Sequence, residues 1–302
     1  MTRYTTAMLP AIRRPTLFDT FRLFFVGAIW GSTFIFVSIL LIDFQPISIA
    51  AWRVLLAAAV LILISFLTRS RFPRSAQHWR YVFIIGALNS AVPFFLISWG
   101  QQYISSAESA LLMAMGTFFA LVVSHFTSED ERINLHRALG VSVGFIGVLV
   151  LVFWDLTESG LGGLKGQIAV MVAGCSYALS TVIARRITHL PSISTSAATM
   201  MSASLYMVPL AFLLENPLPE SVSATSIYSL IFLGVVATAL AITIRFTIIR
   251  ANGAVFMAQV GYLVPLFGVI WSGLYFADAI NLQTILSLAL ILVGIAITRQ
   301  GN

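Results

Sequence analysis

The chain has 302 residues, of which 59% are hydrophobic and only 9% are charged, with a formal net charge of +6 and a mean hydropathy of +0.96. Because a soluble globular protein carries about 25% charged residues, this composition excludes a soluble domain and predicts a chain that lipid covers over most of its surface. A single cysteine, Cys175, excludes an intramolecular disulfide, and no Cys/His cluster has metal-ligand spacing, so we expect neither a metal nor a cofactor.

The basic N-terminal segment contains Pro10 and Pro15 and is followed by an apolar run. This run has about 20 residues, which is longer than the apolar region of a typical signal peptide, so we predict a retained first transmembrane helix. Since one crossing takes roughly 20 apolar residues, the chain divides into ten expected spans joined by short loops. They cover residues 22–42, 47–67, 80–100, 104–126, 136–153, 165–185, 196–214, 227–248, 253–276 and 281–298.

Basic and acidic residues separate by side along these spans. Only Arg53 and Lys165 fall on the outer half, where Asp43, Glu215 and Asp278 also lie. The positive-inside rule then predicts a multi-pass protein of a plasma (inner) membrane of the bacterial type, with both termini in the cytoplasm. The inner set holds 15 of the 17 Lys and Arg residues: Arg3, Arg13, Arg14, Arg22, Arg69, Arg71, Arg74, Arg80, Arg132, Arg137, Arg185, Arg186, Arg245, Arg250 and Arg299.

The first span carries small and polar residues near its middle. Gly27 and Gly31 form a small-xxx-small pair, which is typical of close helix packing. Trp30 and Thr33 lie at midplane depth. Trp30 either lines a solute pathway or packs against another helix, and both interpretations stay open from the sequence.

Polar residues recur at mid-depth in the third span, as Asn89, Ser90 and Pro93, and Met113 lies at similar depth in the fourth. An amide in hydrocarbon costs several kcal/mol unless it forms hydrogen bonds. Asn89 is therefore expected to face protein or water, either bonding a neighbouring helix or meeting a polar solute. Pro93 is a candidate hinge, because a proline loosens a helix.

Glu108 is the one carboxylate inside an expected span, near the outer end of the fourth, and it is close in depth to Arg53 of the second. Two such charges can pair and offset each other's desolvation. Alternatively, both side chains reach the outer interface, or Glu108 binds a coupling proton or the amine of a substrate.

The second half holds a similar set of polar and aromatic residues in its sixth, eighth and ninth spans: Tyr177, Thr238, Gln259 and Tyr262. Gln259 and Tyr262 lie three residues apart and so share a helix face. Pro265 follows them. A proline frees a backbone carbonyl, so Pro265 is either a hinge with an exposed acceptor or a plain kink.

Sliding the chain by 147 residues aligns its second half on its first. Trp30 then meets Tyr177, and Gly147 meets Gly294. A unit of five spans is odd in number, so the second copy is expected to insert upside down relative to the first. Inverted repeats are typical of secondary transporters. The two expected units cover residues 22–154 and 164–299.

Four stretches resemble the EamA repeat of the drug/metabolite transporter superfamily, namely WGSTF, YISSAESALLMAMGTFFALV, EDERINLHRALGVSVGFIGVLVL and AVFMAQVGYLVPLFGVIWSGLYFADAINLQ. The resemblance covers essentially the whole chain. It implies an all-α integral membrane protein, with ten transmembrane helices as two inverted five-helix repeats around a central cavity. At the position of the family's helix-end proline, the second copy has Pro265, whereas the first copy has Phe118. At the position of the family's common lysine late in the first span, this chain has Ser38.

The residues also narrow the substrate class. The mid-depth positions hold no Lys or Arg, and the first span has no carboxylate, so strong anions and cationic drugs are not favoured. Polar-neutral and aromatic side chains suit zwitterionic amino acids, including aromatic ones. We expect a secondary transporter that works by alternating access, and the resemblance implies export of neutral and aromatic amino acids.

The alternatives are an exporter of other small metabolites or drugs, a channel, or a non-transporting receptor. An enzyme is not expected, because the chain lacks H-E-x-x-H and G-x-S-x-G. The expected partners are a small-molecule substrate and the lipid bilayer, without nucleic acid. The chain is expected as a monomer or as a homodimer paired through the glycine faces of the fifth and tenth spans.

Overall fold

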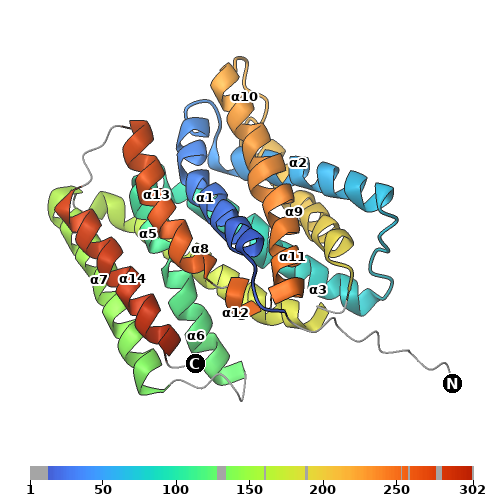
Figure 1. Cartoon of the computed structure of the whole chain (residues 1–302). Coiled ribbons are helices and arrows are strands. Elements are labelled where there is room, and N and C mark those ends of the chain that lie inside the picture. Colours follow the sequence, from blue (N-terminus) through green and yellow to red (C-terminus); the bar gives the residue numbers. More distant parts are fainter. Residues whose placement is uncertain are drawn as a thin grey trace.

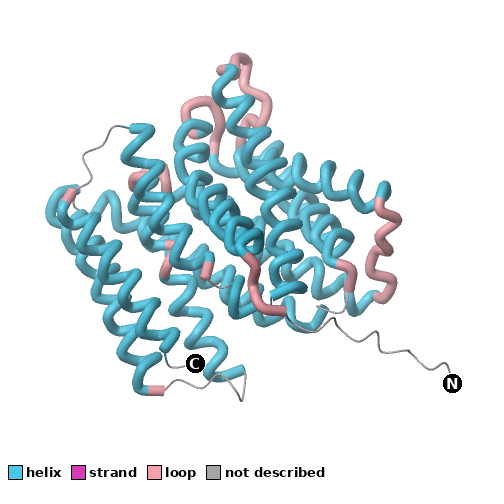
Figure 2. Tube along the Cα trace, in the orientation of Figure 1, coloured by secondary structure: helices cyan, strands magenta, loops and turns pink. Residues whose placement is uncertain are grey.

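The computed structural model describes residues 13–127, 134–159, 161–187, 190–252, 254–257, 259–276 and 281–300. Every regular element in these ranges is helical, and short loops join the helices (Figure 2). Most are α-helices, η1 and η3 are π-helical, and η2 is a 3₁₀ turn. The elements are α1 (Leu17–Leu40), α2 (Pro46–Leu67), α3 (Ala76–Gly86), η1 (Ala87–Ala91), α4 (Val92–Gly100), α5 (Ser106–Leu112), α6 (Met115–Thr127), α7 (Leu135–Ser159), α8 (Leu161–Ala184), η2 (Arg185–Ile187), α9 (Ser192–Leu214), α10 (Ala224–Ile231), η3 (Phe232–Leu240), α11 (Ala241–Asn252), α12 (Ala254–Met257), α13 (Val260–Phe276) and α14 (Leu282–Gln300).

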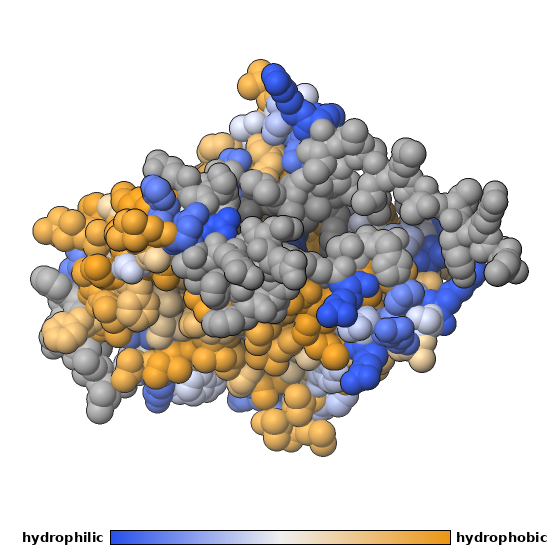
Figure 3. Space-filling view, turned by 90° about the horizontal axis from the view of Figure 1, so that it is seen from below, coloured by the Kyte–Doolittle hydropathy of each residue, from blue (hydrophilic) through white to orange (hydrophobic). Residues whose placement is uncertain are grey.

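The helices are long and apolar, as the composition requires. Eight helical stretches of the described chain could each cross a membrane, and two shorter apolar helices cover Val260–Phe276 and Leu282–Thr298. Large apolar side chains stay exposed, for example Phe66 at 84% and Leu213 at 77%. Figure 3 shows hydrophobic residues spread over much of one face, with hydrophilic residues in smaller groups. Such a surface is stable only against lipid, so the chain is a multi-pass membrane protein.

Helices that are distant in the sequence pack in pairs (Figure 1). α7 runs along α14, α2 runs along α9, and α1 runs along α13. α8 packs against both α4 and α6. Each pair joins a helix from the first half of the chain to one from the second half. The core is therefore shared between the halves.

Gly27 and Gly31 allow α1 to approach α13 closely. A methyl group added at Gly27 would collide with Leu263, and a Cβ added at Gly31 would lie 2.7 Å from the Cβ of Phe267. Small residues at such spacing let two backbones come into contact. The packing role predicted for Gly27 and Gly31 is confirmed.

The glycines of α7 serve the same purpose within the chain. A side chain added at Gly140 would collide with Thr298 on α14, and one added at Gly294 would meet the backbone of Gly144. The α7–α14 contact therefore uses the glycine face that the sequence analysis considered for a homodimer, so this face is not free to pair with a second copy.

Four of the ten predicted spans are not single regular helices in the structure. The third predicted span is interrupted by η1 and the eighth by η3. The fourth divides into α5 and α6, where the amides of Ala114 and Gly116 bond carbonyls three residues back, at 3.0 Å each, and the ninth divides into α12 and α13. Hydropathy windows average about 19 residues, so they register apolar length but not a change of hydrogen-bonding pattern.

Candidate functional site

A buried arginine lies where helices of the two halves meet. Arg53, on α2, is 6% exposed. Its Nε donates a 3.0 Å hydrogen bond to the hydroxyl of Thr238 on η3. Its guanidinium lies 3.7 Å from the centre of the Phe94 ring on α4. A hydroxyl from the second half and a ring from the first half therefore hold the cation.

Tyr177 on α8 completes this group. It is half-buried and packs against the hydrophobic cluster that contains Phe94. We call Arg53, Phe94, Tyr177 and Thr238 the arginine cluster. A guanidinium can bind an anion through a charge-assisted hydrogen bond.

The arginine cluster corrects one prediction. No Lys or Arg was expected among the mid-depth polar positions, whereas the structure buries Arg53 against Thr238 and Phe94. A position along a helix gives approximate depth, but the direction of the side chain depends on how the helix is rotated against its neighbours.

The ion pair considered between Arg53 and Glu108 is not formed among the described residues. The Glu108 carboxylate accepts a 2.8 Å hydrogen bond from the Ser105 amide, while the Ser105 hydroxyl accepts one of 3.2 Å from the Glu108 amide. This reciprocal capping box satisfies amides at the start of α5. Glu108 therefore has a local structural role.

Asn89 and Ser90 are neighbours in η1 but have different surroundings. Asn89 is half-buried, and its Oδ1 accepts a 3.3 Å hydrogen bond from Ser180 on α8. The Asn89 amide nitrogen has no partner among the described residues. Ser90 is fully buried, with its hydroxyl 3.8 Å from the sulfur of Met200 on α9. Of the two, only Asn89 keeps hydrogen-bonding capacity for a solute.

Trp30 joins α1 to the irregular part of the eighth span. Its indole N–H donates a 3.0 Å hydrogen bond to the carbonyl of Ala237 on η3, and the half-buried ring packs against two hydrophobic clusters. Thr33 is buried, and its hydroxyl donates to the Trp30 carbonyl at 2.7 Å. The structure thus gives Trp30 a bridging contact and satisfies Thr33 within its own helix.

Three other predicted pathway residues lie just after α5, just before α13 and within α13. Met113 follows α5 and contacts two hydrophobic clusters. Gln259 is half-buried. Tyr262 is also half-buried, and its hydroxyl donates a 2.9 Å hydrogen bond to the carbonyl of Ile295 on α14. This bond engages the Tyr262 hydroxyl in helix packing.

The two candidate hinge prolines are both buried. Pro93 stands in the first turn of α4, directly after η1. A proline lacks an N–H and its ring clashes with the carbonyl four residues back, and the wider π turn gives that ring room. Pro265 lies inside α13, which continues past it.

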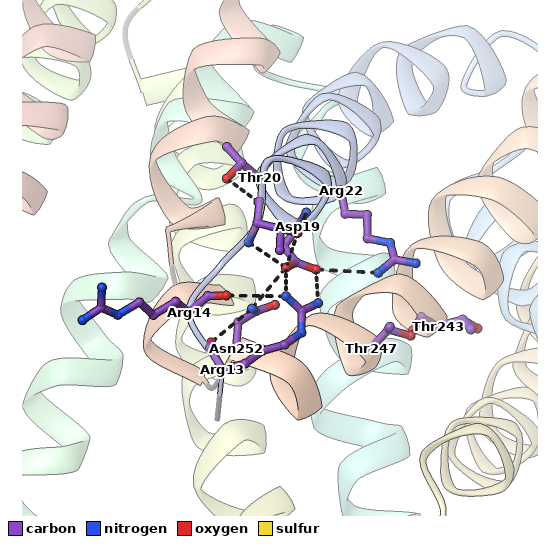
Figure 4. Close-up of polar contacts among 9 residues, drawn as sticks. Arg13, Arg14, Asp19, Thr20, Arg22, Thr243, Thr247 and Asn252 are labelled. Carbon is purple, nitrogen blue, oxygen red and sulfur yellow. Dashed lines mark hydrogen bonds and ion pairs between the residues drawn. The ribbon is translucent and has the colours of Figure 1, made fainter. Parts of the chain in front are cut away.

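A second polar network joins the halves where α1 begins (Figure 4). The Asp19 carboxylate is fully buried and accepts two hydrogen bonds from Arg13, of 2.6 and 2.9 Å. The amide and hydroxyl of Thr16 donate to it at 2.9 and 2.8 Å. Asn252, at the end of α11, donates at 3.3 Å, and the Arg13 amide bonds the Ala251 carbonyl at 3.0 Å.

Two other carboxylates join the halves at the opposite end of α1, which is roughly 36 Å away at 1.5 Å per residue. Asp43 accepts hydrogen bonds from the amide and hydroxyl of Ser223 at 2.9 and 2.7 Å. The hydroxyls of Ser226 and Ser223 and the Ser223 amide hold the pKa of Asp43 below its ordinary value. Glu215 accepts hydrogen bonds from the amides of Ile47 and Ser48 at 2.9 and 2.7 Å.

Arg245 and Asp19 were not among the predicted site residues. Arg245 falls inside the predicted eighth span, and a charge within an apolar span is itself a pointer to function. Asp19 falls just before the predicted first span, whereas α1 begins at Leu17. Acceptor-rich helix starts are common, so no signal in the sequence singled out Asp19.

Comparisons with known proteins agree with this fold. The model of the EamA-like transporter family matches residues 21–153 and again 164–300. The chain is 23% identical over 271 residues to "Uncharacterized transporter YoaV" of Bacillus subtilis (strain 168), covering 89% of this chain and 92% of that protein. It is 24% identical over 294 residues to a Salmonella typhimurium protein named "Probable amino-acid metabolite efflux pump", covering 94% and 95%. A solved crystal structure is similar with a TM-score of 0.68 and 17% identity, covering 94% of this chain and 96% of that one.

Proposed function

Because this chain belongs to the EamA-like transporter family, we propose that it is a secondary transporter that exports neutral and aromatic amino acids by alternating access. Its family and the names of its relatives indicate transporters rather than enzymes. The name of the Salmonella relative supports an amino-acid metabolite as the class of substrate.

We propose that ten crossings form two inverted repeats, at residues 22–154 and 164–299. The two family matches, one in each half of the chain, support this arrangement. Exchanging the halves turns the α1–α13 contact into the α6–α8 contact, and both occur. Shifted by 147 residues, η1 falls on residues 234–238, inside η3. Equal packing and equal irregularities at equivalent places are expected of a repeat.

The sidedness of the basic residues supports a plasma (inner) membrane location with cytoplasmic termini. The Asp19 network would then lie at the cytoplasmic side, and the bonds of Asp43 and Glu215 at the outer side. In alternating access one such set of contacts opens while the other holds, so that the two halves expose a central site to each side in turn.

One observation carries the transport proposal. Asn89 and Tyr177 are half-buried at mid-depth. They belong to the two different segments of the chain that match the family model. The Asn89 side-chain amide also keeps unused hydrogen-bond donors. A polar group at such a depth faces protein or water. A solute passing between the segments would meet it.

Purified protein in proteoliposomes tests the proposal. We expect saturable flux of radiolabelled phenylalanine, tryptophan and leucine that empty liposomes lack. In a Cys175→Ser background, a membrane-impermeant thiol reagent should label Asn89→Cys and block this flux. Ser90→Cys is the matched control, because its side chain is fully buried and should stay unlabelled.

Absence of flux together with an inert Asn89→Cys from both sides would contradict a transport pathway at this place. A metabolite-release screen in cells that over-produce the chain covers the remaining substrates. Release of a different metabolite would support the transporter function and show that the substrate is not an amino acid.

A further inference from the structure

Arg53 is a buried cation without an acidic partner in the part of the chain that the structure describes. Thr238 occupies its Nε, and Phe94 covers a face of its guanidinium. The two Nη groups have no protein acceptor among the described residues. They are also not among the fully enclosed side-chain atoms that lack a partner, so they keep some accessible surface.

A charge inside a membrane protein is expensive and is kept where it meets a counter-charge or a functional group. The Phe94 ring and the Thr238 hydroxyl offset part of this desolvation cost. The two Nη groups of the guanidinium remain without a hydrogen-bond partner among the described residues. The parallel N–H groups of a guanidinium match the two oxygens of a carboxylate.

Other carboxylates of the described residues do not supply this counter-charge. Asp19 binds Arg13, and Glu108 caps α5. Asp43 and Glu215 accept hydrogen bonds from backbone amides at the starts of α10 and α2. Arg53 therefore keeps a positive charge that none of these carboxylates neutralises.

We propose that Arg53 binds the carboxylate of the transported solute, with Phe94 beside the apolar body. This inference rests on the proposed transport function and narrows its substrates. Zwitterionic amino acids and monocarboxylates qualify, and amines that lack a carboxylate do not. Thr238 is a positioning residue, because it acts only through the Arg53 Nε.

Three related probes isolate the carboxylate: L-phenylalanine, 3-phenylpropionate, which lacks the amine, and phenethylamine, which lacks the carboxylate. Binding to the purified protein in detergent is measured by thermal shift and by displacement of radiolabelled L-phenylalanine. We expect L-phenylalanine and 3-phenylpropionate to bind and phenethylamine not to bind.

Substitutions then locate the site. Arg53→Gln should weaken binding of both carboxylates by about tenfold or more, since a charge-assisted bidentate contact is lost. Arg53→Lys should weaken it less, because an ammonium keeps the charge but not the fork. Thr238→Val should give a partial loss. Arg74→Gln, at an exposed arginine of the loop before α3, is the matched control and should bind as the wild type does.

Binding of phenethylamine as tight as that of L-phenylalanine would overturn the proposal, and so would failure of both carboxylates to bind the wild-type protein. Unchanged carboxylate affinity in folded Arg53→Gln would also overturn it. If Arg53→Gln does not fold, unchanged affinity in both Arg53→Lys and Thr238→Val has the same meaning. Carboxylate binding without flux in proteoliposomes would refute the proposed transport and leave the carboxylate-binding proposal intact. Flux of amines alone would support transport and refute the carboxylate-binding proposal.

Discussion

Glu215 ends α9 and reaches the start of α2, where it accepts hydrogen bonds from two amides and from the Ser48 hydroxyl. The first amides of a helix have no partner within the helix and carry partial positive charge. Gln45, the N-cap residue of α2, makes no side-chain cap hydrogen bond. A carboxylate from the other half of the chain therefore stabilises this helix start.

We expect Glu215→Ala to lower the free energy of unfolding by about 1–2 kcal/mol, because the α2 amides and the Ser48 hydroxyl lose their acceptor. Thermal unfolding of the purified protein in detergent measures the change. Glu220→Ala is the control, since Glu220 is exposed in the same loop and should change stability by less than about 0.5 kcal/mol. Equal losses in the two variants would show that Glu215 does not cap α2.

The arginine cluster shows that the expected role of a charged residue depends on the side chains that it contacts. From depth alone, Arg53 could pair with Glu108 or reach the outer interface, and strong anions were not favoured as substrates. Its neighbours in the structure are a hydroxyl and an aromatic ring. A cation held this way keeps its charge available to a ligand, whereas one paired with a carboxylate does not.

At the scale of elements, the irregular helices carry candidate pathway residues. η1 holds Asn89 and η3 holds Thr238, while Met113 lies between α5 and α6 and Gln259 between α12 and α13. π-helical turns occur frequently at functional sites, since they free backbone groups from the regular ladder. Trp30 uses one carbonyl of η3 directly.

In contrast to these irregular helices, α1 and α13 form a close contact through the small residues of α1. A Cβ added at Gly31 would lie 2.7 Å from the Cβ of Phe267 and 2.8 Å from the backbone nitrogen of Gly268. Neither atom is the flexible end of a side chain. One methyl group must therefore push the two helices apart.

We expect Gly31→Ala to destabilise the protein by about 1–3 kcal/mol, as overpacking does. Gly162→Ala in α8 makes a matched control, because nothing lies within 4 Å of its added Cβ. There the better helix propensity of alanine makes the change neutral or stabilising by up to about 1 kcal/mol. Melting temperatures in detergent compare the two, and a tolerant Gly31 would contradict the tight α1–α13 packing.

At the scale of the whole molecule, contacts between the halves lie at both ends of α1. One end has the Asp19–Asn252 hydrogen bond, and the other has the Asp43–Ser223 pair. α1 also packs against α10 and α11. The proposed alternating access requires these two sets of contacts to break in turn, so the site between them meets one side at a time.

Proton coupling would need a carboxylate that changes protonation during this cycle. In the described spans, Asp19 is held by Arg13 and Thr16, and Glu108 caps α5. We therefore expect proteoliposome flux to follow the substrate gradient, with an initial rate that an imposed pH gradient leaves unchanged. A proton ionophore provides the control, and a several-fold stimulation that the ionophore abolishes would contradict facilitated transport.

Hydropathy, charge sidedness and the spacing of small residues are local properties of a chain. They predicted a helical membrane protein, the approximate position of each apolar helix and the packing role of Gly27 and Gly31. The EamA resemblance also needed only the residues of four stretches. None of these features requires knowledge of which helices meet in space.

Which polar side chains meet could be seen only from the packed helices. Arg53 bonds Thr238, 185 residues away, while Asn89 and Ser90, adjacent in sequence, separate into a half-buried and a fully buried position. The physical reason is that helix rotation and the π-helical turns set side-chain direction. In a membrane protein, helix rotation and π-helical turns both depend on packing against distant helices. Neither produces a periodic pattern in a single sequence from which it could be predicted.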